Sequence, residues 1–141
     1  MNNNGPVLIV EDDEDDRELL IDVFRNLKLR NQILFFSSGQ QALNYLRSSD
    51  TIPFLILSDI NMPGLSGPEL CDKIRNDDNL GRLQLPFVYF TTSTTKHAIA
   101  KAYDVAADGF FIKPNSYQEL EDRIQTIVSY WVECQLPSDY S

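Results

Sequence analysis

Five short apolar runs alternate with longer stretches of helical periodicity, and this alternation constrains the fold more than any other feature of the chain. Apolar residues at helical spacing follow each run, as Leu20, Val23, Phe24 and Leu27 do after the first. The runs are almost entirely apolar, which is typical of parallel strands with both faces buried. We predict strands at residues 7–10, 33–36, 54–57, 87–90 and 110–112, each followed by a helix.

Five strand–helix repeats predict an α/β fold, a doubly wound five-stranded parallel sheet with five helices. Right-handed crossovers place these helices on both faces of the sheet. The helix after the fourth strand is indicated by Ile99, Ala102 and Val105. The chain has 141 residues and no evident linker, so we expect a single domain over 1–141, with a core of about 7–131 and a short tail at 134–141.

The composition excludes several classes of function. The formal net charge of −9 argues against direct binding to nucleic acid or to an anionic membrane, because phosphate groups would be repelled. Cys71 and Cys134 lie far apart and show no metal-binding spacing, so a disulfide framework is not expected. The N-terminus lacks the pattern of a signal peptide, and no apolar run is long enough to span a bilayer. These features favour a cytoplasmic protein.

Candidate functional side chains follow four of the five predicted strands. Glu11 and Asp12 come after the first strand, Asp59 after the third, Thr91 after the fourth and Lys113 after the fifth. All strands of a doubly wound sheet end on the same edge, where such folds bind ligands, so we expect these side chains to lie together. Their convergence is more specific than any one of them, since a single aspartate at a strand end is more often a turn or cap residue.

Three of these side chains are carboxylates, which raise one another's pKa unless a cation offsets their charge. Oxygen ligands select a hard cation, Mg²⁺ or Mn²⁺, rather than zinc or copper. Mg²⁺ keeps several waters and often shares its shell with phosphate oxygens. The pattern therefore favours a site that brings a phosphoryl group to a carboxylate.

Four segments at these strand ends resemble the signature segments of the response-regulator receiver family. They are residues 10–13, residues 57–64 with Gly67 beyond them, residues 90–92 and residues 111–114, in the order and with the separations that the family shows. The resemblance covers about residues 7–131. It implies a flavodoxin-like fold with strand order 2-1-3-4-5.

Carried over residue by residue, the resemblance implies that Asp59 is the phosphoacceptor. Thr91 and Lys113 match the residues that bind the phosphoryl oxygens, and Phe110 sits where the family has a movable aromatic that acts with Thr91 as a switch. The lysine–proline peptide at Lys113 is expected to be cis, as in the family. The metal ligands implied by the match are the acidic pair, the phosphoacceptor and one main-chain carbonyl: Glu11, Asp12, Asp59 and Asn61.

The implied function is that of a two-component response regulator. Such a protein accepts a phosphoryl group from a histidine kinase or a histidine phosphotransfer protein, with Mg²⁺ or Mn²⁺ bound, and catalyses only its own phosphorylation and dephosphorylation. The surface formed by the predicted fourth helix, fifth strand and fifth helix is then expected to contact a downstream protein or a second copy of the chain. No direct contact with nucleic acid or membrane is expected.

Other functions share parts of this pattern. A haloacid-dehalogenase-like phosphohydrolase also uses an aspartate on a doubly wound sheet, but it needs a second acid two residues later, where this chain has Asn61. A flavodoxin-like electron carrier has a phosphate-binding first loop, whereas the loop at Glu11 and Asp12 would repel phosphate. A receiver-like scaffold that is not phosphorylated would keep the fold and lose the site.

Overall fold

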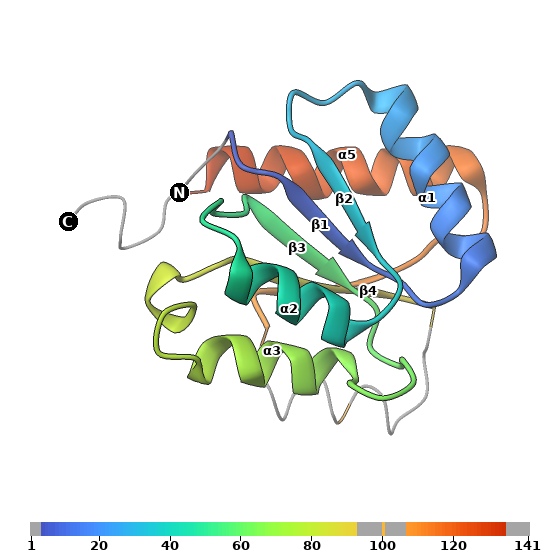
Figure 1. Cartoon of the computed structure of the whole chain (residues 1–141). Coiled ribbons are helices and arrows are strands. Elements are labelled where there is room, and N and C mark those ends of the chain that lie inside the picture. The colour runs from blue at the N-terminus through green and yellow to red at the C-terminus, as the bar shows by residue number, and fades with distance from the viewer. Residues whose placement is uncertain (1–3, 93–99, 101–106, 135–141) are drawn as a thin grey trace.

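The computed structural model describes residues 4–92, 100 and 107–134. These residues form a central parallel sheet with helices on both faces, in which α1 and α5 cover one face and α2 and α3 cover the other (Figure 1). In chain order the elements are β1 (Val7–Val10), α1 (Glu14–Leu27), β2 (Ile33–Phe36), α2 (Gly39–Ser48), β3 (Leu55–Ser58), α3 (Gly67–Asn76), the 3-10 helix η1 (Gly81–Leu83), β4 (Phe87–Thr91), β5 (Gly109–Ile112) and α5 (Tyr117–Glu133).

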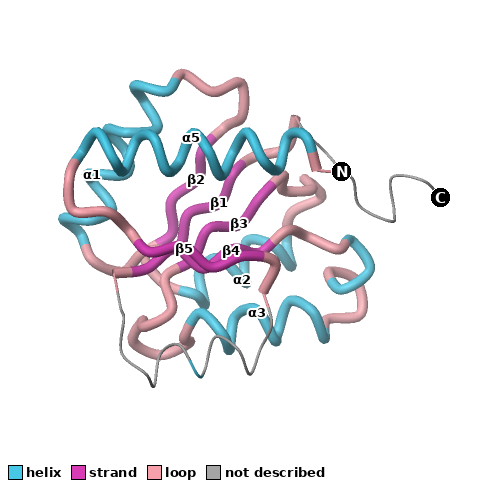
Figure 2. Tube along the Cα trace, turned by 180° about the vertical axis from the view of Figure 1, so that it is seen from behind, coloured by secondary structure: helices cyan, strands magenta, loops and turns pink. Residues whose placement is uncertain are grey.

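The strand order is β2-β1-β3-β4-β5, and every pairing is parallel, which confirms the predicted topology (Figure 2). The predicted fourth helix, around Ile99 to Val105, lies outside the described residues except for Ala100, which is helical. Within the described part of the chain, no helix combines the length and the apolar character needed to cross a membrane.

Side chains of β1 alternate between two cores, as the period of a strand requires. Val7 and Ile9 pack into a cluster with apolar residues of α1 and α5, while Leu8 and Val10 pack into another with residues of α2 and α3. The three inner strands are buried throughout, but β2 and β5 lie at the sheet edges and are only partly buried. The continuous apolar runs of the inner strands thus reflect burial on both faces.

The acidic run at residues 11–16 is divided between two structural roles. Asp13 is the N-cap of α1, and its side chain accepts a hydrogen bond from the main-chain N–H of Asp16 at 2.9 Å. Glu14, Asp15 and Asp16 occupy the first turn, where negative charge is favourable to the helix dipole. Glu11 precedes the helix and is 1% exposed, so helix capping does not explain it.

Candidate functional site

Main-chain hydrogen bonds extend the ladder past the ends of the strands and so bring the polar residues to one edge. The N–H of Glu11 donates to the carbonyl of Phe36 at 3.0 Å, and the N–H of Asp59 donates to the carbonyl of Val10 at 3.0 Å. The N–H of Lys113 donates to the carbonyl of Thr91 at 2.9 Å. The residues directly after β1, β3 and β5 are therefore fixed by the sheet itself.

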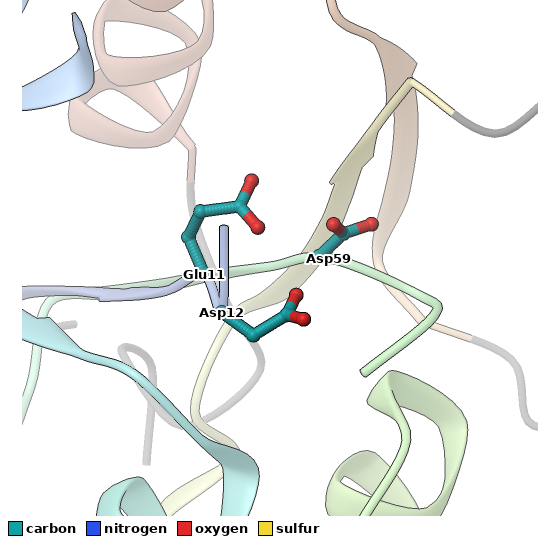
Figure 3. Close-up of side chains that lie close together, drawn as sticks. All are labelled: Glu11, Asp12 and Asp59. Atoms are coloured by element: carbon teal, nitrogen blue, oxygen red, sulfur yellow. The ribbon is translucent and has the colours of Figure 1, made fainter. Parts of the chain in front are cut away.

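Three carboxylates meet at this edge. Glu11, Asp12 and Asp59 each offer an oxygen, and these oxygens lie within 4.8 Å of one another. The side chains converge from the end of β1 and the end of β3 (Figure 3). Glu11 is buried, whereas Asp12 and Asp59 are partly exposed, so the cluster opens toward solvent on one side.

The carboxylate of Asp59 is oriented by two donors. Its Oδ1 accepts a hydrogen bond from the N–H of Ile60 at 2.7 Å and another from the hydroxyl of Thr91 at 2.5 Å. A hydroxyl donating to a carboxylate forms a short, charge-assisted bond. The end of β4 is thereby joined to the end of β3 through Thr91, which is itself 1% exposed.

Lys113 lies beside Glu11. Its ammonium donates a hydrogen bond to Oε1 of Glu11, and it is 3.8 Å from Oδ2 of Asp16. Burial raises the pKa of Glu11 to about 7; the attraction of Lys113 opposes this rise, and the charge of Asp59 adds to it. The expectation that Lys113 belongs to the acidic crevice therefore agrees with the geometry, and its partner there is the first carboxylate of the pair.

The loop after Asp59 folds back, so that Gly67 lies against the main chain of Asp59 and Ile60. The N–H of Gly67 donates to the carbonyl of Ile60 at 2.8 Å. A Cβ atom at Gly67 would lie 2.3 Å from the carbonyl oxygen of Asp59, so no other residue type fits there without displacing main chain. Asn61, the implied source of a carbonyl ligand, is exposed at the start of this loop, two residues after Asp59.

Phe110 lies next to the site on the neighbouring strand. It pairs with Tyr89 in the β4–β5 register, and their rings are in edge contact with centroids 6.5 Å apart. Thr91 is two residues beyond Tyr89 and therefore projects from the same face of β4. Phe110 is 38% exposed, so its ring is only partly covered in this arrangement.

The expected cis peptide at Lys113 is wrong, because none of the described peptide bonds is cis. The family-derived expectation assumed that a cis turn directs the lysine into the crevice. Here the ladder bond between Lys113 and Thr91 already places the lysine at the sheet edge, and its long side chain reaches Glu11 from a trans main chain.

The donor set fits a hard divalent cation. All three side chains offer oxygen, which Mg²⁺ and Mn²⁺ prefer. Oxygens bound to Mg²⁺ at about 2.1 Å stand up to about 4.2 Å apart, so the present separations need only small side-chain adjustments. Glu11, Asp12 and Asp59 are thus the described residues able to hold such an ion at this edge.

Sequence reasoning missed Arg17. Its guanidinium donates to the main-chain carbonyl of Glu11 at 2.9 Å and lies 3.4 Å from that of Asp12. The available signal was a single base directly after six consecutive acids. That signal was too weak, because the pattern does not show a side chain reaching back over six residues.

Comparison with known proteins decides the family. The family model described as the response regulator receiver domain matches residues 7–125. The chain belongs to this family. It is a two-component signalling receiver, and this membership decides against a haloacid-dehalogenase-like phosphohydrolase.

Relatives match nearly the whole chain. The probable methanogenesis regulatory protein FilR2 of Methanothrix harundinacea is 29% identical over 89% of this chain and 83% of its own length. The phosphorylated cyanobacterial phytochrome response regulator RcpA is 26% identical, with a TM-score of 0.81 over 95% of this chain and 99% of its own. The Mn²⁺-bound form of response regulator Rcp1 is 27% identical, with a TM-score of 0.76 over 94% of this chain and 99% of its own. The family match over residues 7–125 includes the positions of the acidic cluster.

The acidic cluster predicts binding of Mg²⁺ to the full chain. Asp12→Asn should weaken this binding by about tenfold or more, since it removes a ligand charge. Amide chemical shifts followed during a Mg²⁺ titration measure the affinity. Asp15→Asn, which makes the same charge change on the exposed first turn of α1, is the matched control and should bind as the wild type does. Equal affinity in the wild type and Asp12→Asn would exclude the site.

The raised pKa of Glu11 predicts a pH-dependent stability in the metal-free chain. Between its ordinary value near 4.5 and about 7, folded Glu11 binds a proton that the unfolded chain has released. The free energy of unfolding should therefore fall as pH rises through about 7, relative to Glu11→Gln, which lacks this titration. Urea unfolding of both proteins at pH about 5 and about 8 measures the difference. A difference that stays the same at both pH values would contradict the raised pKa.

Proposed function

We propose that Asp59 accepts a phosphoryl group from a histidine kinase or a histidine phosphotransfer protein, with Mg²⁺ or Mn²⁺ held by Glu11, Asp12, Asp59 and the main-chain carbonyl of Asn61. One observation carries the proposal. The Asp59 carboxylate lies within 4.8 Å of two other acids and accepts the Thr91 hydroxyl at 2.5 Å. An acid in a simple helix cap would have neither the two partner acids nor the buried hydroxyl.

In this proposal an oxygen of the Asp59 carboxylate attacks the phosphorus of a phosphohistidine. The new O–P bond forms as the P–N bond breaks, and the histidine nitrogen leaves with the electron pair. Phosphoryl transfer asks the protein mainly for positioning and charge neutralisation. The bound cation would supply part of that neutralisation.

The remaining residues bind the transferred group. The Thr91 hydroxyl, now on Oδ1 of Asp59, transfers its hydrogen bond to a phosphoryl oxygen. Lys113 pairs with another oxygen and for this leaves Glu11. The Glu11 carboxylate would then help to hold the cation. Water later hydrolyses the acyl phosphate and restores Asp59. The chain acts as a switch and has no separate substrate to turn over.

The partners follow from the chemistry of the site and from the relatives. RcpA is a phytochrome response regulator in its phosphorylated form, so kinases that contain a phytochrome are the first donors to test. We place the output on the surface of β5, α5 and the predicted helix between β4 and β5, where a downstream protein or a second copy would bind. A net charge of −9 disfavours nucleic acid and anionic membrane as direct partners. Cys71 and Cys134 are both in the thiol form, which suits a cytoplasmic protein.

Asp59→Asn should abolish phosphorylation, because an amide cannot form the acyl phosphate. Intact mass of the chain, after incubation with phosphorylated histidine kinases of the source organism at short times or with a small acyl phosphate, detects one added phosphoryl group. Asp15→Asn should still be phosphorylated, since Asp15 lies exposed in the first turn of α1. The proposal would be wrong if Asp59→Asn gained a phosphoryl group, or if the wild type gained no phosphoryl group from any donor.

Thr91→Ala should accept phosphate on Asp59 and largely lose the response at Phe110. The hydroxyl is the direct link from Asp59 to β4, and Tyr89 on the same face contacts the Phe110 ring. NMR of the chain with a stable phosphoryl mimic measures the response at Phe110, and mass measures phosphorylation. The full wild-type shift at Phe110 in Thr91→Ala would show that the signal takes another route.

A further inference from the structure

We propose that Arg17 is a positioning residue for the acidic pair, holding the main chain of residues 11–13 so that both carboxylates face the cation site. This inference rests on the metal site of the proposed function. It concerns a residue that touches neither the cation nor the phosphoryl group and acts only through the ligands.

The Arg17 side chain contacts two consecutive carbonyls. The Arg17 guanidinium donates through Nη1 to the carbonyl of Glu11 at 2.9 Å and lies 3.4 Å from the carbonyl of Asp12. Its main-chain N–H donates to the carbonyl of the N-cap Asp13 at 2.9 Å, the first main-chain bond of α1, which any residue at this position would make. Arg17 is partly buried, so these bonds are shielded from some of the competition with water. The segment between β1 and α1 is therefore tied to the first turn of the helix.

The two consecutive acids can face the same site only if the main chain between them is held in a bend. In an extended strand, successive side chains point to opposite faces of the sheet. Glu11 and Asp12 are consecutive, yet both carboxylates lie in the crevice with Asp59 (Figure 3). The main chain must leave the extended path after β1 to allow this. Arg17 holds the carbonyls at that bend through one guanidinium nitrogen, Nη1, whose two N–H groups can donate to adjacent acceptors.

Removing Arg17 should change the Mg²⁺ affinity in opposite directions, depending on whether Arg17 acts through its charge or through positioning. A positive charge near the site repels a cation, so if Arg17 acted through its charge alone, removing it would strengthen Mg²⁺ binding. Interactions between partly exposed charges are small. Loss of a residue that orients metal ligands typically costs about tenfold or more in metal affinity. We therefore expect weaker binding after removal.

The experiment is a Mg²⁺ titration of the full chain, followed by the amide shifts of Asp59 and Asn61. Arg17→Ala should bind about tenfold more weakly than the wild type. Arg17→Lys keeps the charge, but its side chain is one bond shorter than the path to Nη1, so it should also bind more weakly. Arg25→Ala is the matched control on the same helix, because Arg25 is exposed and its ion pair is with Asp22 at 3.7 Å. It should bind as the wild type does.

The outcomes separate the two proposals. A wild type that does not bind Mg²⁺ would overturn the metal site and the role of Arg17 together. A wild type that binds, with Arg17 variants that bind equally or more tightly, would overturn only the positioning role. Thermal unfolding of each variant sets a titration temperature at which all are folded. If Arg17→Ala does not fold, Arg17→Lys carries the test, and wild-type affinity in that variant overturns the role.

Discussion

The structure depends on a balance of charge at one edge of the sheet. The parallel ladder delivers three carboxylates to the same place, and their mutual repulsion must be offset for the fold to tolerate them. Lys113 offsets part of it from the end of β5, through its bond to the buried Glu11. The ladder itself cannot relax the crowding, because Asp59 is bonded to the chain at Val10. Any added positive charge would therefore stabilise the three carboxylates. A receiver whose chemistry is assisted by a metal ion requires this property.

The same edge combines a rigid part and an adjustable part. The main chain at Glu11 and Asp59 is fixed by strand pairing, whereas the contacts of Lys113 and Thr91 to these two residues are made by side chains. A fixed main chain beside side-chain contacts would allow a chemical change at Asp59 to alter those contacts without unfolding the sheet. From Thr91, the face shared with Tyr89 and Phe110 leads to the edge strand β5.

Much of the fold could be predicted because buried strands appear in the sequence as continuous apolar runs. The runs at 7–10 and 33–36 match β1 and β2 without error, while β3 begins and ends one residue later than predicted. An apolar run shows which residues are buried but not which are hydrogen-bonded, and polar Ser58 still pairs with Val10. The convergence of Glu11, Asp12 and Asp59 was predictable from topology alone. The reach of long side chains was not, so Arg17 was missed and the bond between Lys113 and Glu11 was not foreseen.

The close approach at Gly67 has a mechanical consequence. Gly67 is the first residue of α3, and it rests against the main-chain carbonyl of Asp59 with no space for a side chain between them. Its N–H is also bonded to Ile60. The start of α3 and the main chain of Asp59 therefore lie as close together as a glycine allows. A side chain at position 67 would push the start of α3 away from Asp59, on the face of the sheet opposite to α1 and α5.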